Sequence, residues 1–410
     1  MLCGPLGTHI FCRGAQMSNE LLATYAIPRQ GDWPRRAEEM AVGMTVGSWT
    51  DLPALEQERL TAFLGRVTRC DAVSDDWAHV QIAYPAANLP PQLSAVLTVA
   101  FGKLSLDSPI RLVGLSLPDS WPKALPGPHH GAAGVRQRLG VPARPLLLSI
   151  FKSENGRTLA EFAHALDQQW AGGADIVKDD EIFFADQAAP LGERVRAARD
   201  LASSLAARSG RPAPLYAANL TASGDRAVDQ AATAMAAGAE AFLVSPYAMG
   251  LDTLAALSRL EPHPILLSHP AFAGAFISTS GHGVAASVAL GVLTRAAGAD
   301  IGIFPSPYGS VALPRAEAQA VGQALCGPAV RRPALPAPAA GLHPGLVPQL
   351  VGDFGSDVVI NAGGAIHGHP DGTQAGARAF RAAIDRLSHP DGPVPPELLA
   401  AWAKWGAGPR

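Results

Sequence analysis

The chain has few cysteines, few lysines and no long apolar run, and each shortage excludes a class of protein. The four cysteines (Cys3, Cys12, Cys70 and Cys326) form no CxxC pair and no plausible disulfide ladder, which favours a reducing cytoplasm. No run reaches the roughly 18 apolar residues of a membrane span. The net charge is -3, and basic residues cluster only in short pairs. We therefore expect a cytoplasmic protein with no membrane or nucleic-acid partner.

Lysine is scarce, because arginine supplies most of the 32 basic residues. An amine can lose its proton, act as a base or react with CO2, whereas a guanidinium cannot. The few lysine positions are therefore candidates for chemistry. They are Lys103, Lys123, Lys152, Lys178 and Lys404.

The 410 residues are enough for one large domain and a smaller one. We expect residues 1–16 to be a disordered extension or a start-site artefact, with Met17 as the alternative start. Residues 17–131 predict a compact α+β (ferredoxin-like) domain that ends in a linker at 126–131. Residues 389–410 are expected to form a C-terminal tail or helix. Within the first domain we predict strands at Ala23–Pro28 and His79–Tyr84 and a helix at Trp33–Met44.

Residues 132–388 repeat one pattern, in which a short apolar run is followed by polar or small residues and a helical stretch. Eight such units indicate a parallel sheet closed into a (β/α)8 TIM barrel, so the fold class is α/β. A doubly wound sheet is the alternative. The seventh run is interrupted by two prolines, which weakens it as a strand. The predicted strands are Leu146–Phe151, Asp175–Val177, Leu215–Ala218, Ala239–Val244, Pro264–Leu267, Ala299–Phe304, Leu335–Ala340 and Asp357–Ile360.

Polar or backbone-exposing residues follow nearly every predicted strand. In a (β/α)8 barrel these positions line the active site. They are Lys152, Lys178, Asp180, Glu181, Asn219, Ser245, His269, Ser306, Gly341, His343, Asn361, Gly363 and Gly364.

The segment Gly172–Glu181 carries the strongest chemical signal, because an apolar run ends in one lysine and three carboxylates. Asp180 and Glu181 are hard oxygen ligands suited to Mg²⁺. If CO2 adds to the amine of Lys178, the resulting carbamate is a third anionic oxygen ligand. The alternative is an ordinary ion pair between Lys178 and one of the two carboxylates at the barrel rim.

Other strand-end residues suggest an anionic substrate. Lys152 is either a cation of the barrel mouth or an exposed loop lysine. Backbone amides at Gly363 and Gly364 can cradle a phosphate, although most Gly-Gly pairs are simply turns. His269 and His343 are substrate ligands, bases or structural residues. A metal site at His367-Gly368-His369 is disfavoured, since no further ligand follows at helical spacing.

On these residues the chain resembles the RuBisCO superfamily across about residues 20–388. Residues 172–181 are similar to the family's carbamylated-lysine and magnesium motif, which implies Lys178 as the carbamate and Asp180 and Glu181 as the other Mg²⁺ ligands. The resemblance also implies that Lys152 is the lysine after the first barrel strand and that His269 contacts substrate. Gly341, Gly363 and Gly364 match the phosphate-site glycines.

The chain departs from the carboxylases of that superfamily. Glu154 replaces a second lysine, Pro270 replaces an arginine, and residues 305–315 contain no lysine. Gly43 and Val99 stand where the carboxylases carry a glutamate and an asparagine. The resemblance therefore implies a RuBisCO-like protein that fixes no CO2. We also expect Glu154 to place a negative charge near the phosphate site.

Within the RuBisCO-like (type IV) group, the chain is most similar to the methionine-salvage enolases acting on 2,3-diketo-5-methylthiopentyl-1-phosphate. That similarity implies a Mg²⁺-dependent keto-enol tautomerase, with Lys103 as the general base. It rests on Leu21–Tyr25, Thr45–Pro53, Phe101–Ser105, Ser149–Lys152, Lys178–Phe184, Phe304–Arg315 and Asn361–Gly364.

Two other functions stay open. One is a related RuBisCO-like enzyme, such as a methylthioribulose-phosphate isomerase or an oxo-isoapionate-phosphate decarboxylase. The other is a non-catalytic binder of a sugar phosphate or a protein. The resemblance further implies a homodimer with shared active sites, in which Ser48, Trp49 and Lys103 of one subunit serve the barrel of the other.

Overall fold

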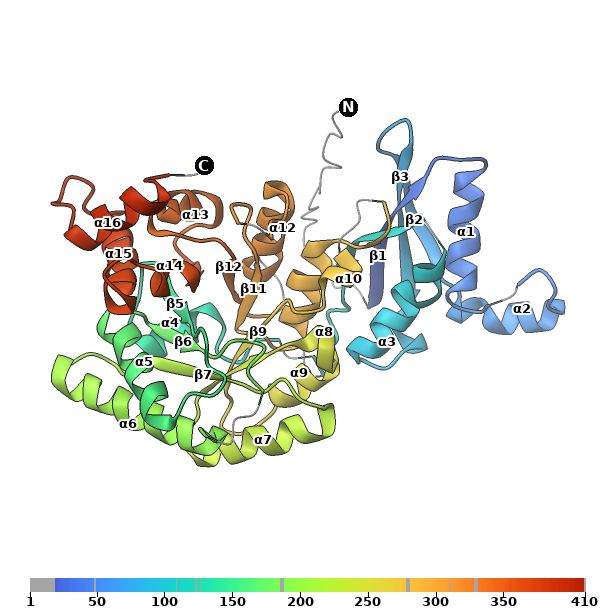
Figure 1. The fold of residues 1–410 in the computed structure, drawn as a ribbon. Helices are drawn as coiled ribbons and strands as arrows, with labels where there is room; N and C mark the ends of the chain where they lie inside the picture. The colour runs from blue at the N-terminus through green and yellow to red at the C-terminus, as the bar shows by residue number, and fades with distance from the viewer. Residues whose placement is uncertain are drawn as a thin grey trace.

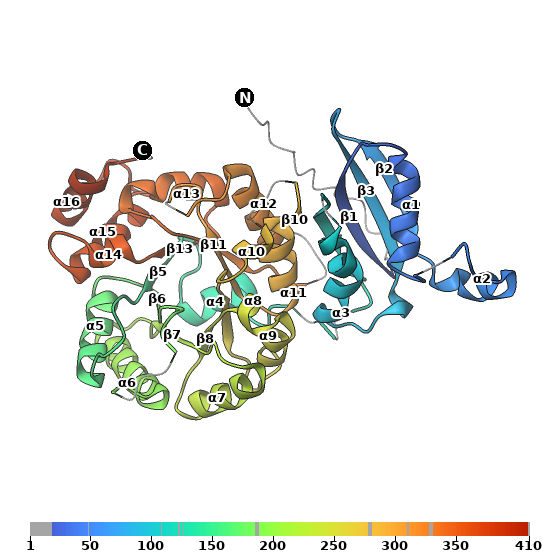
Figure 2. The same cartoon turned by 45° about the vertical axis from the view of Figure 1, so that its right-hand side comes forward.

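The computed structural model describes residues 19–47, 49–107, 109–121, 124–125, 127–184, 188–277, 281–309, 311–327 and 331–408. The expectations for residues 1–16, Met17 and Ser48 fall on residues outside that set. A small sheet domain precedes a larger barrel, and the two lie side by side (Figures 1 and 2). In the described part of the chain, none of the helices is both long and apolar enough to traverse a bilayer.

The N-terminal sheet has the ferredoxin-like arrangement that we predicted. Its first four strands pair antiparallel in the order β4-β1-β3-β2, with helices α1 and α2 between β1 and β2 and helix α3 between β3 and β4. Strands β2 and β4 were not predicted. Strand β2 is largely exposed and polar, so no apolar run marks it. The elements are β1 (Glu20–Pro28), α1 (Trp33–Gly43), α2 (Ala54–Leu60), β2 (Arg66–Ala72), β3 (Trp77–Pro85), α3 (Leu93–Leu97) and β4 (Arg111–Ser116).

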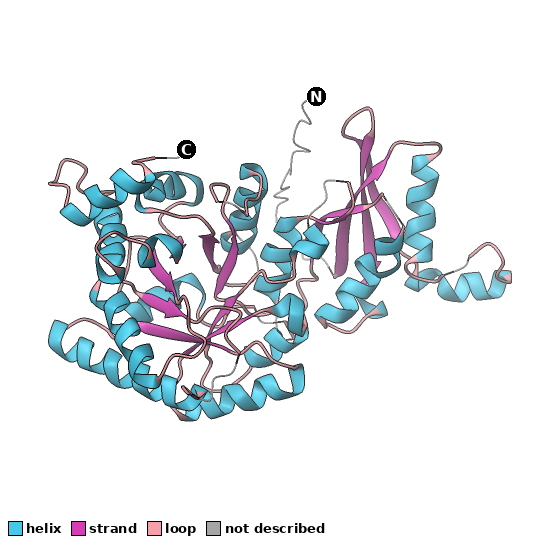
Figure 3. Ribbon diagram, in the orientation of Figure 1, coloured by secondary structure: helices cyan, strands magenta, loops and turns pink. Residues whose placement is uncertain are grey.

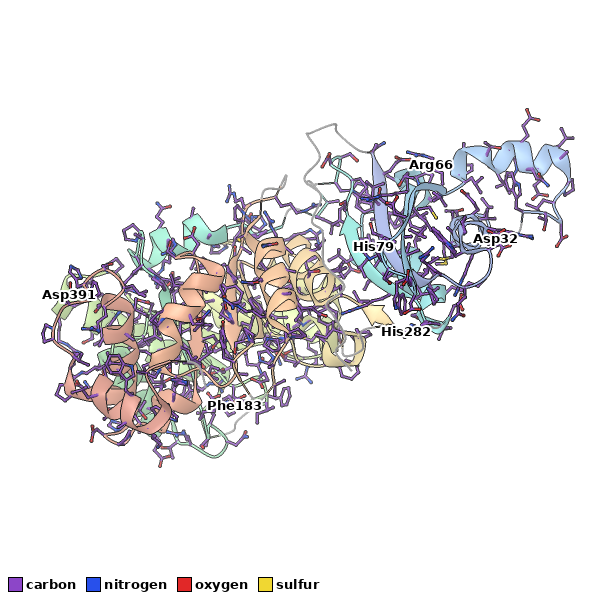
Figure 4. All side chains as sticks on the ribbon, turned by 90° about the horizontal axis from the view of Figure 1, so that it is seen from above. Asp32, Arg66, His79, Phe183, His282 and Asp391 are labelled. Carbon is purple, nitrogen blue, oxygen red and sulfur yellow. The ribbon has the colours of Figure 1, made fainter. Side chains whose placement is uncertain are left out.

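The barrel portion of the chain contributes to this N-terminal sheet. Strand β10 (Gly283–Val284) pairs in parallel with β4, so the sheet extends beyond residues 17–131. Just before β10, His282 Nε2 lies 3.0 Å from Ser105 O, and Figure 4 places His282 at the junction of the two parts. A second tie involves the Asp252 carboxylate, which accepts hydrogen bonds from Leu93 N at 3.0 Å and Ser94 N at 2.9 Å. The two parts are therefore joined by backbone pairing as well as by side chains.

The eight predicted barrel strands are all present, in the order β12-β11-β9-β8-β7-β6-β5-β13. Every pair of hydrogen-bonded neighbours is parallel. Helices surround the strands, as Figure 3 shows. The strands are β5 (Leu146–Ile150), β6 (Ile176–Lys178), β7 (Leu215–Asn219), β8 (Ala241–Val244), β9 (Ile265–Ser268), β11 (Ile301–Pro305), β12 (Leu335–Ala339) and β13 (Val359–Ala362).

The barrel is nearly closed, and its seam lies between β12 and β13. Leu335 N donates at 2.8 Å to the carbonyl oxygen of Asp300, the residue just before β11. Alternate residues of a strand turn their backbone polar groups to opposite neighbours, so the second and fourth residues of β12 face β13. Those residues are Pro336 and Pro338, which have no N–H to donate. The two prolines therefore leave the strand intact and remove the hydrogen-bonded ladder on one side of it.

The barrel interior is filled by layers of four side chains from alternate strands. The strand registers place Leu148, Ala217, Leu267 and Ala337 in one apolar layer. Towards the C-terminal ends of the strands, the next layer is Lys178, Leu243, Ile303 and Asn361, and the last is Ile150, Asn219, His269 and Ala339. Within these three described layers, the polar side chains lie in the two nearer the end where the active site is expected.

The barrel helices are α4 (Gly131–Leu139), α5 (Leu159–Ala171), α6 (Leu191–Ser209), α7 (Gly224–Ala236), α8 (Pro246–Met249), α9 (Leu251–Leu257), α10 (Gly274–Ile277), α11 (Thr294–Ala296), α12 (Arg315–Cys326), α13 (Val347–Phe354), α14 (Gly364–His367), α15 (Thr373–Asp385) and α16 (Pro396–Trp405). The last of these forms the C-terminal helix and contacts α15. Helix α2 differs from them because it buries none of its residues, and Leu55 is 82% exposed.

Candidate active site

Lys178 ends β6 and is fully buried, with 0% of its surface exposed. Its Nζ donates to Asp179 O at 3.0 Å and lies 3.7 Å from Glu181 Oε2. Burial lowers the pKa of Lys178 by more than the charges of Glu181 and Asp180 raise it. The ion pair with Glu181 therefore coexists with a lowered pKa. A lowered pKa increases the fraction of neutral amine, which is the form that reacts with CO2.

His269 follows β9 and contacts the same carboxylate. Its Nδ1 accepts a hydrogen bond from Ala271 N at 3.1 Å, which leaves the proton on Nε2, 3.3 Å from Glu181 Oε2. Burial, followed by the positive charge of Lys178, lowers the pKa of His269 to about 3. The contact with Glu181 is accordingly a hydrogen bond from a neutral imidazole at neutral pH.

Lys152 reaches the same group from the end of β5. Its Nζ donates to Asp180 Oδ2 at 2.6 Å, and 43% of its side chain is exposed. A side chain at Gly363 would approach Lys152 Cε to 3.2 Å, so this glycine lies directly against the lysine. The structure therefore brings together Lys152, Asp180 and Gly363 as one edge of the barrel mouth.

Two further glycines flank this edge. Gly341 follows β12 with φ of +69°, a conformation that favours glycine, and Gly364 opens the short helix α14. His367 and His369 each contact a backbone carbonyl oxygen, with His367 Nε2 2.8 Å from Ile150 O and His369 Nε2 2.8 Å from Glu397 O. These two contacts lie in different segments, which favours structural roles for both histidines.

We expected Glu154 to place a negative charge near the phosphate site, but its surroundings in the structure disfavour the charged form. Only 4% of it is exposed, and its Oε2 accepts from Asp180 N at 2.5 Å. Burial and the nearby charge of Asp179 raise the pKa of Glu154 to about 10. Both effects favour the neutral form of Glu154, which supports the backbone of Asp180 through the hydrogen bond to its N–H.

Asp179 anchors this strand end to helix α6 and strand β7. Its carboxylate accepts hydrogen bonds from Arg194 Nη2 at 3.1 Å, from Asn219 N at 2.9 Å and from the Tyr216 hydroxyl. The Arg194 guanidinium also lies 4.4 Å from the ring centre of Phe183. This buried network holds the backbone on either side of Asp179, and therefore positions Lys178 and Asp180.

Sequence reasoning did not find the network. Asp179 was visible only as one of three consecutive carboxylates. Period-two alternation turns it away from the barrel interior, to which Lys178 points. Arg194 and Tyr216 carry no signal in their own segments, because an arginine on a helix and a tyrosine on a strand are ordinary.

The donor set of the mouth fits a hard divalent cation only in part. Among the described residues, no three His, Cys, Asp or Glu side chains are grouped as metal ligands. Asp180 and Glu181 supply two carboxylates, and the third group beside them is the amine of Lys178. A carbamate on that amine would complete a set of three oxygen donors, so the residues fit a cation bound together with CO2.

Lys103 lies apart from these residues. It begins a helical turn, Lys103–Leu106, which follows α3 in the N-terminal domain. Figures 1 and 2 both show α3 on the other side of the molecule from α5 and α6, the helices that follow β5 and β6. Among the described residues, the contacts that join Lys152, Lys178 and the carboxylates do not include Lys103.

Comparison with known proteins agrees with this architecture. The family described as "Ribulose bisphosphate carboxylase large chain, catalytic domain" matches residues 131–304 and 329–404. A 2,3-diketo-5-methylthiopentyl-1-phosphate enolase of Bacillus licheniformis is 44% identical over 400 residues, covering 95% of this chain and 98% of the relative. The enolase of the same name from Geobacillus kaustophilus is 45% identical over 383 residues, covering 90% of this chain and 92% of the relative.

Solved structures give the same result. A rubisco-like protein from Alicyclobacillus acidocaldarius has a TM-score of 0.87 and 44% identity, covering 94% of this chain and 100% of that one. An octameric ribulose-1,5-bisphosphate carboxylase/oxygenase from Pyrococcus horikoshii has a TM-score of 0.84 and 26% identity, covering 95% of this chain and 94% of that one. The chain therefore belongs to the RuBisCO large-chain family, as one of its RuBisCO-like proteins.

Proposed function

We propose that this protein is the enolase that converts 2,3-diketo-5-methylthiopentyl-1-phosphate into its 2-hydroxy-3-keto enol in methionine salvage. The observation that carries the proposal is the cluster of Lys178, Glu181, Asp180 and Lys152 at the barrel mouth, in a chain 44% identical to relatives named for this activity. The absence of a lysine in residues 305–315 argues against a carboxylase.

In this proposal Lys178 as a carbamate, Asp180 and Glu181 would hold Mg²⁺, which when bound would supply Lewis acidity to the diketone and so acidify its C1 proton. His269 orients Glu181 through its Nε2–H, and the Asp179 network keeps Asp180 and Lys178 in place. These contacts reduce the reorganisation that the ligand set needs when the substrate arrives.

Lys152 and the backbone of Gly341, Gly363 and Gly364 are proposed to bind the phosphate group. Lys152 is partly exposed, and Gly363 lies against its side chain, so one anion can contact both. Binding the phosphate there fixes the C1–H bond relative to the carboxylate cluster. The enolisation then moves one proton, from C1 to a base and from an acid to the carbonyl oxygen at C2.

Lys103 of the partner subunit is the proposed base. The position of Lys103 supports a shared site, because in its own chain it lies in the N-terminal domain away from the mouth. Helix α2 of the same domain buries no residue, as expected for a segment that contacts a second copy. The homodimer is the minimum assembly in which Lys103 and Lys178 can meet.

The test is turnover of the diketone phosphate by the purified protein with Mg²⁺, with and without bicarbonate. We expect enol formation that depends on both. Lack of turnover, with reaction of methylthioribulose phosphate or an oxo-isoapionate phosphate instead, would overturn the assignment. For the base, Lys103→Ala should slow deuterium entry from solvent into C1; exchange at the wild-type rate would show that another group removes the proton.

A further inference from the structure

Asn361 is a polar side chain inside the barrel that the mechanism above does not use. It is 1% exposed, and its register partner is Leu148 on β5. Val359, two residues earlier on the same strand, belongs to the interior core, so Asn361 also points into the barrel. Both polar atoms of its carboxamide, Nδ2 and Oδ1, lack a hydrogen-bond partner among the residues that the structure describes.

Such an arrangement is costly, because buried polar groups are normally paired. An apolar residue at this position would continue the packing of Leu243 and Ile303, the two apolar members of the same layer. The fourth member of the layer is Lys178, which the registers of β13, β5 and β6 place beside Asn361. The unpaired carboxamide is therefore next to the one interior residue whose chemistry is expected to change.

The NH2 group of a carboxamide donates hydrogen bonds and its oxygen accepts them. The ammonium and the carbamate forms of Lys178 differ in which of these groups they can pair with. An ammonium offers donors only. When the neutral amine attacks CO2, its lone pair forms the N–C bond, one C=O π pair moves to oxygen, and an N–H proton leaves to water. The resulting carbamate keeps one N–H beside a negatively charged oxygen. That donor and acceptor pair is complementary to the Oδ1 and Nδ2–H of a carboxamide.

We propose that Asn361 is a positioning residue for the carbamate of Lys178, donating Nδ2–H to one carbamate oxygen and accepting the carbamate N–H at Oδ1. This inference rests on the carbamate of the proposed function. The pairing uses one carbamate oxygen and leaves the other free for the cation. It also gives the buried carboxamide partners only after CO2 has been added, so Asn361 favours the carbamylated state over the free amine.

The experiment measures carbamate formation directly, without turnover. Full-length protein is equilibrated with ¹³C-labelled CO2 in the absence of a divalent cation, and the carbamate carbon is followed by ¹³C NMR, with Lys178→Ala as the blank. Asn361→Leu is close in volume to the wild-type residue but has no polar side-chain atoms. We expect half of Lys178 to be carbamylated in this variant only at a CO2 concentration at least about 10-fold higher than in wild type, because a charge-assisted hydrogen bond is lost. Ile303→Val, in the same layer, is the packing control and should stay within about 2-fold of wild type.

A second readout separates positioning from a purely structural role. In CO2-free buffer Asn361→Leu should have a thermal midpoint equal to or above that of wild type, because it removes two unpaired buried polar atoms. At the CO2 concentration that half-saturates wild type, CO2 should raise the midpoint of wild type by more than that of the variant. If Asn361→Leu does not fold, Asn361→Asp keeps the size, removes the donor and adds a repelling charge, and should weaken carbamylation at least as much.

Two results contradict the inference in distinguishable ways. If wild type is carbamylated and Asn361→Leu needs no more CO2 than Ile303→Val, Asn361 has no positioning role and the proposed function stands. If wild type gives no carbamate signal at any CO2 concentration, the carbamate part of the proposed function is itself wrong, and the inference falls with it.

Discussion

The barrel mouth and the N-terminal domain hold their proposed catalytic lysines in opposite ways. Lys178 is fully buried and contacts the carboxylate of Glu181 in its own chain, whereas Lys103 is exposed on a helical turn of the N-terminal domain. The contacts of Lys178 form within one folded chain. Under the proposed function, the metal ligands would therefore come from one chain, whereas proton transfer by Lys103 would require a second copy.

The largest effect is expected from the barrel side of this comparison. Lys178→Ala should reduce turnover to the level seen without a divalent cation, because two carboxylates remain where three oxygen ligands are needed. Lys404→Ala is the matched control, since Lys404 lies on the C-terminal helix and donates to Gly368 O. Calorimetric titration with Mg²⁺ and bicarbonate measures the loss of binding. Full cation binding by Lys178→Ala would contradict a lysine-derived ligand.

The N-terminal side is tested by mixing subunits. Lys103→Ala alone should lower the rate by about 10²–10⁴-fold, the usual contribution of a general base. After exchange with Lys178→Ala subunits, about one quarter of the wild-type activity should return, because random pairing makes half of the dimers mixed and each mixed dimer has one intact site. If verified mixed dimers have no activity, both lysines serve the same chain.

Glu154 offers a smaller effect, on stability. The folded protein keeps the Glu154 proton up to a pKa of about 10, while the unfolded chain releases it near 4.5. The contribution of this group is therefore fully present below about pH 4.5 and decreases as pH rises, by at most about 1.4 kcal/mol per pH unit. Glutamine does not titrate, so the thermal midpoint of Glu154→Gln should rise relative to that of wild type as the pH is raised from 6 to 9.

The control for that comparison is Glu161→Gln. Glu161 belongs to the capping box of α5, and its pKa is lowered by hydrogen bonds from Thr158. It is ionised in both folded and unfolded chains across the same range, so the difference from wild type should not change with pH. A constant difference for Glu154→Gln as well would mean that Glu154 is charged in the folded protein.

The smallest effect concerns the junction between the two regions. Asp252→Ala removes the carboxylate that accepts from Leu93 N and Ser94 N, and should cost about 1 kcal/mol, as for other acceptors at helix N-termini. Asp252→Asn keeps one acceptor and should lose less. Urea unfolding monitored by circular dichroism measures both. An unchanged stability for Asp252→Ala would show that water replaces the carboxylate without loss.

The two regions also differ in how far the sequence predicts them. Every barrel strand is visible as a short apolar run, because a strand buried on both faces must be apolar, and the site residues follow from where those runs end. In the N-terminal domain, β2 is exposed and polar, so no such run marks it. Pairings between distant segments are not visible in either region: the Asp179–Arg194 contact and the strand β10 depend on tertiary packing alone.

Strand β10 has a consequence for dissecting the molecule. Gly283 and Val284 come after five of the barrel strands in the sequence, yet they cover the outer edge of β4. A fragment ending at residue 131 would lack them and present β4 as a bare edge, which invites aggregation. Conversely, a fragment that contains the barrel alone would leave residues 283–284 without β4, the strand with which they form backbone hydrogen bonds. The chain is therefore expected to express well only as a whole, and swapping N-terminal domains between relatives would have to carry residues 282–284 along.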